Sequence, residues 1–484
     1  MKNKYFTEKS FTFLTINFIV GLGFLTTITE IFNLGLWGYL VISLSLLTVC
    51  GTALVFSRMG NAFKDHYGGS YSYVRHLDKT LFEEELPNFS KWERIKRKLI
   101  HNFCFYVGWN QFLQSPVLSS ISPLFLASAF ELAIPKTTHN FEIIIWSIRI
   151  ISIVFFGSLI LISTKGLKLN TKVVFMTSVV KWGFIALGLF ILIGFIIKNS
   201  GAGYLDLVSK QIKKQVSVSL IFVNILIFIF AFAGIEDMAS MAKDAHFKNF
   251  RKVLFISLGI VSSIYFVSYT LFLGLKLNEN DTIEHFSKIY HLALGSTGIV
   301  VFIIGFIFND IGYKITQSVS TARKLIPLAL DNHINPKYAD HNQHGEYKNA
   351  ILFTAILTFL SMLVLWLLPT LLSKDSSENN PYFIAVIGVN AVALLLEDTF
   401  TTVVALILSR KKIIDKIPLW EKIIYSINIV WILTLLNIYL FPFILNNDWK
   451  QEHTFVIVVY LSFILIGFVF KLSWTIKQKR KSKN

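Results

Sequence analysis

The sequence predicts an all-α polytopic membrane protein of about twelve transmembrane helices, of which the first and sixth are discontinuous. Three observations support this fold class. Of the 484 residues, 54% are hydrophobic and only 15% are charged, which is too apolar for a soluble protein of this length. Glycine-rich interruptions fall inside two apolar stretches, residues 15–32 and 216–239, and basic residues are concentrated in alternate loops.

Twelve apolar windows are long enough to cross the hydrocarbon core of a bilayer as helices. In chain order they lie near residues 13–33, 37–59, 103–130, 141–163, 172–197, 217–240, 253–275, 297–318, 349–372, 382–409, 420–445 and 453–474. The first window follows a basic start, as a signal peptide would, but it has no convincing small-residue cleavage site. We therefore interpret it as a retained helix 1.

The net charge of +17 has a topological explanation. Basic residues cluster before residue 10 and at 58–98, 165–172, 243–252, 323–348, 410–422 and 471–483, whereas the opposite loops hold few. Such an excess marks cytoplasmic loops, so we expect a multi-pass protein of the plasma membrane with both termini in the cytoplasm. No nucleic-acid partner is needed to explain the charge. The two cysteines, Cys50 and Cys104, lie in or beside apolar windows and indicate neither a disulfide framework nor a metal site.

Residues 76–101 form an insertion of mixed charge before helix 3. We expect an interfacial amphipathic helix on the cytoplasmic side, with Trp92 and Ile95 toward lipid and the basic side chains toward the headgroups. A solvated surface excursion is the plainer interpretation of such a charge run, and a regulatory or partner site is the alternative to it.

The two interruptions predict a substrate cavity and internal symmetry. Residues 21–23 interrupt helix 1, and residues 231–234 interrupt helix 6 at a matching depth. In lipid every backbone N–H and C=O needs a partner, so such breaks persist where the freed groups face protein or a polar cavity. Helices 1 and 6 run in opposite directions, which is the signature of an inverted repeat. We therefore expect repeats at 13–197 and 217–409 within a single domain, with two peripheral helices at 420–474.

Several motifs resemble those of one transporter family. They are IVGLGF at residues 19–24, GGSYSYVR at 68–75, VGWNQF at 107–112, FAFAGIE at 230–236, a charged tract at 243–251 and TARKLIPLALDNHINP at 321–336, in the loop after helix 8. Together they resemble the amino acid, polyamine and organocation (APC) permease superfamily, in its amino acid permease branch. The resemblance implies a LeuT-like core of five plus five helices.

The resemblance also implies that the backbone at the two breaks binds an amino acid. The substrate-binding residues are then Ile19, Gly21, Leu22, Gly23, Phe230, Ala231, Ala233 and Gly234. The N–H groups of the helix 1 triplet lie beside the N-terminus of a half-helix and suit a carboxylate, whereas the freed carbonyl groups suit an ammonium. The family often has Ser or Thr at the position of Leu22, so a hydroxyl contact to the carboxylate is missing here.

Two residues of helix 6 match gating positions of the family. Phe230 matches an aromatic gate that covers bound substrate, and Glu236 matches the Glu that supports the unwound backbone or a gate. Further candidates for the cavity lining are polar residues of helices 3 and 8, namely Gln111, Gln114, Asn309 and Asp310. Hydrogen bonding between helices is the ordinary alternative for such groups.

Lys181 in helix 5 is the clearest mechanistic feature. It lies nine residues, or about 13 Å at helical rise, from Lys172 and farther from the outer end, so neither surface is within easy reach. A lysine at the membrane centre is costly enough to be functional by default, and a buried lysine can exchange a proton. Some proton-coupled permeases are similar in placing a lysine near the contact of helices 1 and 8. We predict proton coupling through Lys181; the alternative is a structural lysine paired with a carbonyl or carboxylate.

Other polar residues have simpler interpretations. The remaining intramembrane ionisable residues are Glu30, Arg149, Asp237, Lys314, Glu397 and Asp398. Arg149 is near enough to the outer end of helix 4 to snorkel, and Glu397 and Asp398 are expected to face the cytoplasmic pathway or to pair with a base. The loop histidines His333, His341 and His344 do not have a zinc spacing, so no metal site is expected.

These features predict a secondary active transporter that imports an amino acid by alternating access, coupled to protons. An exchanger of amino acid against a metabolite or amine is the first alternative, and a non-transporting sensor with the same fold is the second. No motif combines a nucleophile, a base and an orienting group, and no phosphate-binding loop occurs, so neither an enzyme nor a cofactor is expected. The sequence leaves open which amino acid is carried, the contribution of helix 10 near Gly388 and Asn390, and the oligomeric state.

Overall fold

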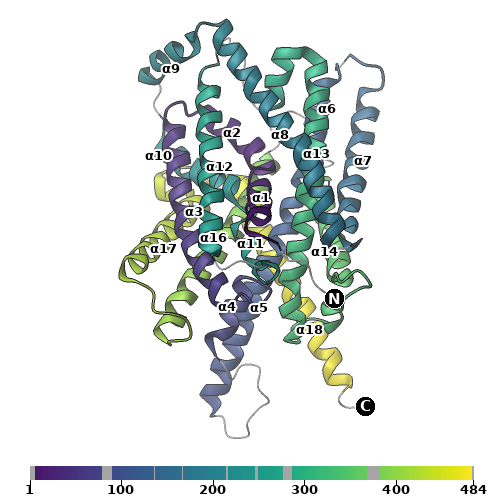
Figure 1. Cartoon of the computed structure of the whole chain (residues 1–484), viewed down its shortest axis with the longest axis vertical. Helices are drawn as coiled ribbons and strands as arrows, with labels where there is room; N and C mark the ends of the chain where they lie inside the picture. The colour runs from purple at the N-terminus through teal and green to yellow at the C-terminus, as the bar shows by residue number, and fades with distance from the viewer. Residues whose placement is uncertain are drawn as a thin grey trace.

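The computed structural model describes residues 6–78, 90–135, 137–165, 167–213, 216–245, 249–275, 286–367 and 381–481, which form a bundle of helices (Figure 1). These residues contain no strand, only a β-bridge between Phe6 and Ala245. Eleven of their helices are long and apolar enough to cross a membrane, or twelve if the bent first pair is one span. The predicted all-α polytopic fold is confirmed.

The helices follow the predicted windows in order. The first five windows correspond to α1 (Glu8–Ile19) with α2 (Leu22–Phe32), α3 (Trp37–Ala62), α5 (Lys91–Ser119) with α6 (Ile121–Ala133), α7 (Phe141–Ile162) and α8 (Leu167–Lys198). The next five are α10 (Val218–Ile229) with η3 (Phe230–Phe232) and α11 (Ile235–Ser240), α12 (Phe250–Leu273), α13 (Ser287–Leu330), α14 (Lys348–Met362) with η6 (Leu363–Leu367), and α16 (Pro381–Arg410). The last two are α17 (Leu419–Leu440) and α18 (Gln451–Lys481). Short helices connect them: α4 (Ser70–Val74), α9 (Ala202–Lys213), η1 (Arg75–Leu77), η2 (Ser163–Lys165), η4 (Ala242–Asp244), η5 (Pro336–Ala339) and η7 (Pro442–Leu445).

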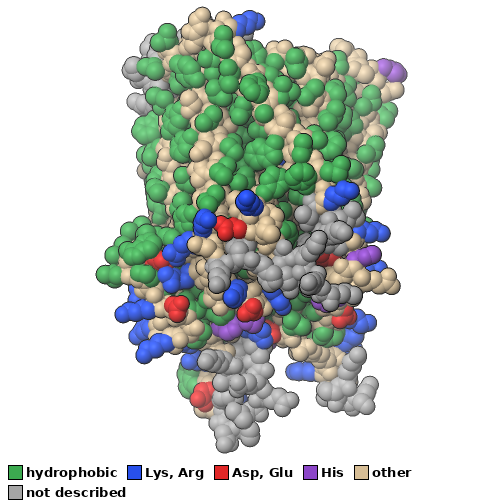
Figure 2. Space-filling view, viewed as in Figure 1, with side chains coloured by type: hydrophobic (Ala, Val, Ile, Leu, Met, Phe, Trp, Pro, Cys, Tyr) green, Lys and Arg blue, Asp and Glu red, His purple; other side chains and the backbone are tan. Residues whose placement is uncertain are grey.

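The two ends of the bundle differ in charge. The start of α1 and the end of α18 lie toward the lower end in Figure 1, and α9 lies at the opposite end. Figure 2 shows Lys and Arg side chains gathered over the lower part of this face, below a broad hydrophobic band. We call the lower end the basic end and the opposite end the far end. A hydrophobic band bordered by charged side chains is the surface that a bilayer requires.

The predicted interfacial helix before helix 3 is wrong for residues 91–101, because these residues are the first turns of α5. Ser90 and Glu93 form a capping box that starts α5, and the helix then continues without a break to Ser119. Trp92 is 80% exposed on this extension, which projects from the basic end (Figure 1). Residues 79–89 of the insertion lie outside the described residues. The hydropathy window missed the extension because its charged turns are helical but not apolar.

Helix α13 is longer than its predicted window of 297–318. It runs from Ser287 to Leu330 with a kink at Gly295, so the first part of the motif at 321–336, predicted to be a loop, is helical. Its charged residues Arg323 and Lys324 are buried, and both are paired with carboxylates. A hydropathy window treats charged residues as exposed to water and ends the predicted helix before them. In the structure the ion pairs satisfy these charges, so the helix continues inside the protein.

Two of the sequence motifs pack against each other at the basic end. A Cβ atom on Gly68, which has φ +100°, would lie 2.5 Å from Pro327 of α13. The Tyr71 hydroxyl donates to Asp331 at 2.6 Å, and Arg75 pairs with Asp331 at 2.8 Å. The motif at 68–75 therefore anchors the end of α13, which itself packs along α8 and α5.

Candidate functional site

The two predicted helix breaks meet in the centre of the bundle. Helix α1 ends at Ile19, α2 starts at Leu22, and the two helices are bent by 48°. Opposite them, α10 ends at Ile229 and α11 starts at Ile235. The first N–H groups of α2 have no acceptor within their own helix, so they form a patch of donors at the break.

Glycine is required at both breaks. A Cβ atom on Gly23 would lie 2.8 Å from the Phe230 carbonyl oxygen and 3.1 Å from the Ala231 Cα atom, so the backbones of α2 and η3 touch at this point. Gly234 has φ +127°, and a Cβ atom there would lie 2.5 Å from the Phe18 ring. Any side chain at these two positions would separate the breaks.

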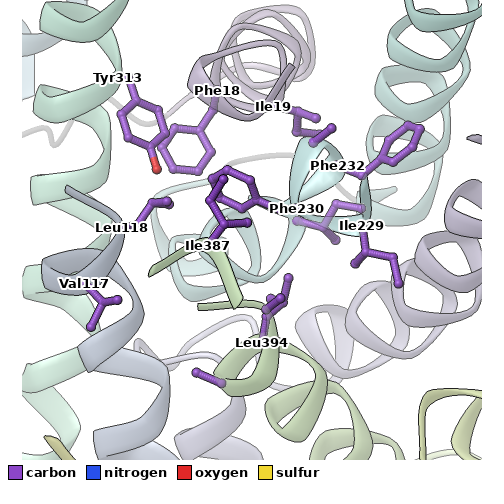
Figure 3. Close-up of a cluster of buried hydrophobic side chains, with 14 of the residues drawn as sticks. Phe18, Ile19, Val117, Leu118, Ile229, Phe230, Phe232, Tyr313, Ile387 and Leu394 are labelled. Atoms are coloured by element: carbon purple, nitrogen blue, oxygen red, sulfur yellow. The ribbon is translucent and has the colours of Figure 1, made fainter. Parts of the chain in front are cut away.

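A small cavity of about 20 Å³ lies between the breaks. Its lining comes from α1, α2, η3, α11, α5, α13 and α16 and consists of Phe18, Ile19, Gly23, Gln114, Ser115, Leu118, Phe230, Ala233, Gly234, Glu236, Asp237, Tyr313, Gln317, Asn390 and Leu394. Figure 3 shows Phe230 at the centre, with Phe18, Tyr313, Leu118 and Ile387 around it. The cavity has room for about one water molecule. An amino acid would fit only after these side chains move apart.

The structure brings half of the ten predicted substrate-binding residues to this cavity. Ile19, Gly23, Phe230, Ala233 and Gly234 line it. Gly21, Ala231, Gln111 and Asn309 are not part of the lining, and the side chain of Leu22 lies outside the described residues. Whether these residues contact a substrate stays a prediction.

Two of the carbonyl groups predicted to bind an ammonium already have a donor. The hydroxyl of Tyr265 in α12 donates to the Ala231 oxygen at 2.6 Å and to the Ile19 oxygen at 3.3 Å. Tyr265 is fully buried and stacks on Phe24 at 4.8 Å. It therefore ties the two breaks together. No sequence signal distinguishes Tyr265, because it is one aromatic residue among many in an apolar window.

Glu236 supports the broken backbone of helix 6. Its Oε2 atom accepts the N–H of Gly234 at 3.0 Å, and the side chain also lines the cavity. The next residue, Asp237, pairs with Lys324 of α13 at 2.9 Å. The predicted role of Glu236 in a gate stays a prediction.

The polar residues of helices 3 and 8 have different environments. Gln114 lines the cavity and donates to Glu397 of α16 at 2.7 Å, whereas Gln111 lies near Gly69 and accepts the Tyr71 N–H at 3.4 Å. Asp310 accepts from Ser122 at 3.0 Å. The buried Asn309 amide has no hydrogen-bond partner among the described residues.

Lys181 is buried at the junction of α8 with α1. Its Nζ atom donates to the Asn17 carbonyl oxygen at 2.5 Å, two residues before α1 ends, and lies 5.6 Å from the Trp182 ring. Helix α13 is adjacent, because a Cβ atom on Gly312 would lie 2.7 Å from Thr177 and 3.9 Å from Asn17. Lys181 thus lies beside α1, and Thr177, one turn earlier on α8, lies beside α13; the coupling role of Lys181 stays a prediction.

Sequence reasoning missed several residues of the cavity. Phe18 stacks on Tyr313 at 5.0 Å, and the Gln317 amide donates to the Tyr313 hydroxyl at 2.9 Å. Asn309 was the helix 8 candidate, and Tyr313 and Gln317 lie four and eight residues after it. Residues four and eight positions after Asn309 lie on the same face of a helix, so the sequence could have indicated both Tyr313 and Gln317.

A set of buried ion pairs separates the cavity from the basic end. It joins α13 to residues of α11 and the loops, and we call it the gate cluster: Lys324, Asp237, Ser320, Arg323, Asp244, Glu346 and Tyr67. Arg323 pairs with Asp244 and lies 3.5 Å from Glu346. Burial raises the pKa of the Glu346 carboxyl above its ordinary value, although Arg323 opposes the shift. Through Asp237 this cluster is in direct contact with the cavity lining.

The other predicted ionisable residues are also placed. Arg149 is 7% exposed and pairs with Glu131 at 2.6 Å, so pairing rather than snorkelling satisfies it. Glu397 accepts from Ser70 at 2.5 Å and Asp398 accepts from Thr52 at 3.1 Å.

His333 packs on His101 at 4.2 Å, whereas His341 packs on Tyr347. Gly388 faces Tyr439 of α17, so helix 10 reaches the cavity through Asn390 and Leu394 instead.

Comparison with known proteins extends the resemblance over nearly the whole chain. A family model described as "Amino acid permease" matches residues 6–470. The chain is 29% identical to "Uncharacterized protein MG225" of Mycoplasma genitalium over 492 residues, which cover 99% of this chain and 97% of that protein. It is 30% identical to "Uncharacterized protein MG226" of the same organism over 505 residues, with 99% and 97% covered. It is 27% identical to "Uncharacterized protein MG226 homolog" of Mycoplasma pneumoniae over 500 residues, with 98% and 95% covered.

Proposed function

Because the chain belongs to the amino acid permease family, we propose that it imports amino acids across the plasma membrane by alternating access, driven by protons. The observation that carries this proposal is the meeting of two broken helices at one enclosed cavity. Irregular backbone at membrane depth is costly unless it serves a cavity. In transporters such a crossing of half-helices binds the substrate.

The backbone at the crossing suits both charged ends of an amino acid. The N-terminus of α2 offers unpaired N–H groups and a partial positive charge to the carboxylate. The carbonyl groups of Ile19, Phe230, Ala231 and Ala233 are acceptors for the ammonium. A carbonyl oxygen has two lone pairs, so the Tyr265 bond to Ala231 leaves room for a second donor.

The closed geometry around the cavity supports transport by alternating access. The two expected repeats, residues 13–197 and 217–409, would rock against each other about the crossing. Release toward the basic end requires the pairs of the gate cluster to separate, and Phe230 would then cover the substrate from one side. The excess of positive charge makes the basic end the cytoplasmic end in this proposal.

Lys181 is the group we propose for proton coupling. It reaches from α8 to the last turn of α1, so its protonation state is linked to the position of the broken helix. A protonated Lys181 holds the Asn17 carbonyl. A neutral Lys181 loses one donor and the attraction of its charge, and α1 is then freer to tilt.

Transport by the purified protein in proteoliposomes tests the function. We expect a labelled amino-acid mixture to accumulate when the outside is more acidic than the inside, and only to equilibrate without the gradient. Uptake that requires preloaded amino acid would instead identify an exchanger. Binding without flux would identify a sensor, and either result contradicts the proposal.

A lysine substitution tests the coupling. Lys181→Ala should abolish gradient-driven accumulation, while exchange of labelled against unlabelled substrate continues, because exchange needs no net proton movement. Lys198→Ala is the matched control, since Lys198 is exposed at the end of the same helix. Gradient-driven accumulation by Lys181→Ala at the rate of the control would refute the coupling role.

A further inference from the structure

The groups around the cavity carry an excess of negative charge. Glu236 and Asp237 line the cavity directly. Glu397 and Asp398 lie just behind it, because Glu397 binds the lining residue Gln114 and Asp398 is one turn beyond Leu394 on the same helix. None of the lining residues is Lys, Arg or His.

Among the described residues, Lys324 is the cation that pairs with this acidic group. Lys324 pairs with Asp237 at 2.9 Å, and its charge also acts on Glu236 and Glu397. The other three carboxylates receive neutral donors: the Gly234 N–H, the Ser70 and Thr52 hydroxyls, and the Gln114 amide. Glu236, Glu397 and Asp398 are also near enough to repel one another. Carboxyl groups buried this close together are relieved either by taking up protons or by a second cation.

An independent observation places an acceptor in the cavity itself. Asn390 lines the cavity and is only 2% exposed, and its side-chain oxygen has no hydrogen-bond partner within the described ranges. A buried carbonyl without a donor is costly. One oxygen of Asp398, on the same helix, is likewise without a partner in the part of the chain that the structure describes. Of these two atoms, only the Asn390 oxygen belongs to a residue that lines the cavity, so it is the one that a donor in the cavity would satisfy.

We propose that the substrate is a cationic amino acid, whose side-chain ammonium or guanidinium binds between Glu236 and Asn390. Glu397, which accepts from the lining residue Gln114, lies behind this position and extends the negative field. The carboxylate and α-ammonium occupy the crossing of the broken helices, so this inference rests on the proposed function. A cation with three or more donors satisfies the Asn390 oxygen and Glu236 together, which no apolar side chain can do.

Competition among paired analogues tests the charge alone. Arginine should inhibit the uptake of labelled lysine into proteoliposomes. Norleucine and citrulline should inhibit it only at concentrations at least about tenfold higher, because a charged hydrogen bond to a buried carboxylate is worth more than tenfold in affinity. Norleucine and citrulline match lysine and arginine in size but carry no side-chain charge. Putrescine, which has no carboxylate, should compete weakly.

The outcomes separate the two proposals. Uptake of neutral amino acids that lysine does not inhibit would overturn the cationic substrate and leave the permease function intact. Putrescine that competes as well as lysine would overturn the amino-acid part of the inference. Failure to take up any amino acid, charged or neutral, would overturn the proposed function itself.

Isosteric substitutions test the residues. Glu236→Gln keeps an acceptor for the Gly234 N–H but removes the charge, and it should lower the preference for lysine over norleucine about tenfold. Glu397 does not line the cavity, so Glu397→Gln should lower this preference less than Glu236→Gln does. The ratio is measured on one preparation, so a folding defect affects both substrates equally. Glu142→Gln, exposed at the start of α7, is the matched control, and an unchanged ratio in both cavity variants would refute the inference.

Discussion

At the scale of single residues, the site depends on positions where nothing larger than hydrogen fits. Gly23 lets the first turn of α2 touch the backbone of η3, and Gly234 turns the chain through a left-handed conformation beside Phe18. Tyr265 then holds the two breaks together through the Ala231 and Ile19 carbonyl oxygens. Backbone contact of this kind aligns donors and acceptors without any specific side chain. We therefore expect a site of this kind to tolerate Leu22, which has no hydroxyl to offer.

Substitution of Gly23 should therefore disrupt transport. Gly23→Ala places a methyl group 2.8 Å from the Phe230 oxygen, which forces the two breaks apart at a cost of about 1–3 kcal/mol. We expect lower uptake and a lower melting temperature in detergent. Gly183→Ala in α8 is the matched control, since nothing lies within 4 Å of a Cβ atom there. Equal uptake by the two variants would show that the close approach is not needed.

At the scale of elements, α13 connects the cavity to the basic end. Tyr313 and Gln317 line the cavity, and Lys324 and Arg323, about two turns later, belong to the gate cluster. A movement of α13 therefore changes the cavity and the gate together. Helix α8 packs along the same helix and carries Lys181, so α13 can also respond to changes at α1.

Removal of one partner from the gate cluster should destabilise the closed form. Arg323→Gln leaves Asp244 and Glu346 buried without their cation, which costs about 3–5 kcal/mol for a buried ion pair. Thermal unfolding in detergent should show a melting temperature several degrees lower. Arg410→Gln, at the exposed end of α16, should melt like the unmodified protein. If both variants melt alike, the cluster does not stabilise the closed form.

At the scale of the whole molecule, the charge asymmetry sets the orientation. Basic side chains gather at one end of the bundle, below the hydrophobic band in Figure 2, and the end of α18 lies at that end. From the positive-inside rule we expect the basic end to face the cytoplasm. In the proposed mechanism this orientation sets the direction in which a proton gradient would drive the substrate.

Cysteine labelling in intact cells tests the orientation. His139, between α6 and α7, and His344, between η5 and α14, are exposed and lie in loops of opposite ends. A membrane-impermeant maleimide should label the His139→Cys variant in intact cells and the His344→Cys variant only after permeabilisation. The unmodified protein, with Cys50 and Cys104, gives the background. The reverse pattern would invert the topology.

The sequence alone was sufficient for the fold class, the order of spans and the two breaks. Apolar windows and glycine interruptions are local signals, because the cost of burying backbone in lipid applies to each segment separately. Local signals also identified Lys181 and most of the backbone positions at the crossing. The extensions of α5 and α13 were missed because a hydropathy window ends at charged turns. Whether such turns are buried, as in α13, or project from the bundle, as in α5, depends on how the other helices pack.

Only the tertiary structure decided which residues share the cavity and how the charges are paired. Phe18, Tyr313, Asp237 and Asn390 come from four helices, and no spacing along the chain reveals that their side chains converge. The same holds for the pairing of Lys324 with Asp237, whereas Glu236 and Glu397 make no ion pair with a cation among the described residues. Side-chain contacts between distant segments depend on the rotation and depth of every helix at once. The pattern of one segment therefore gives the breaks, and only the packing gives the site.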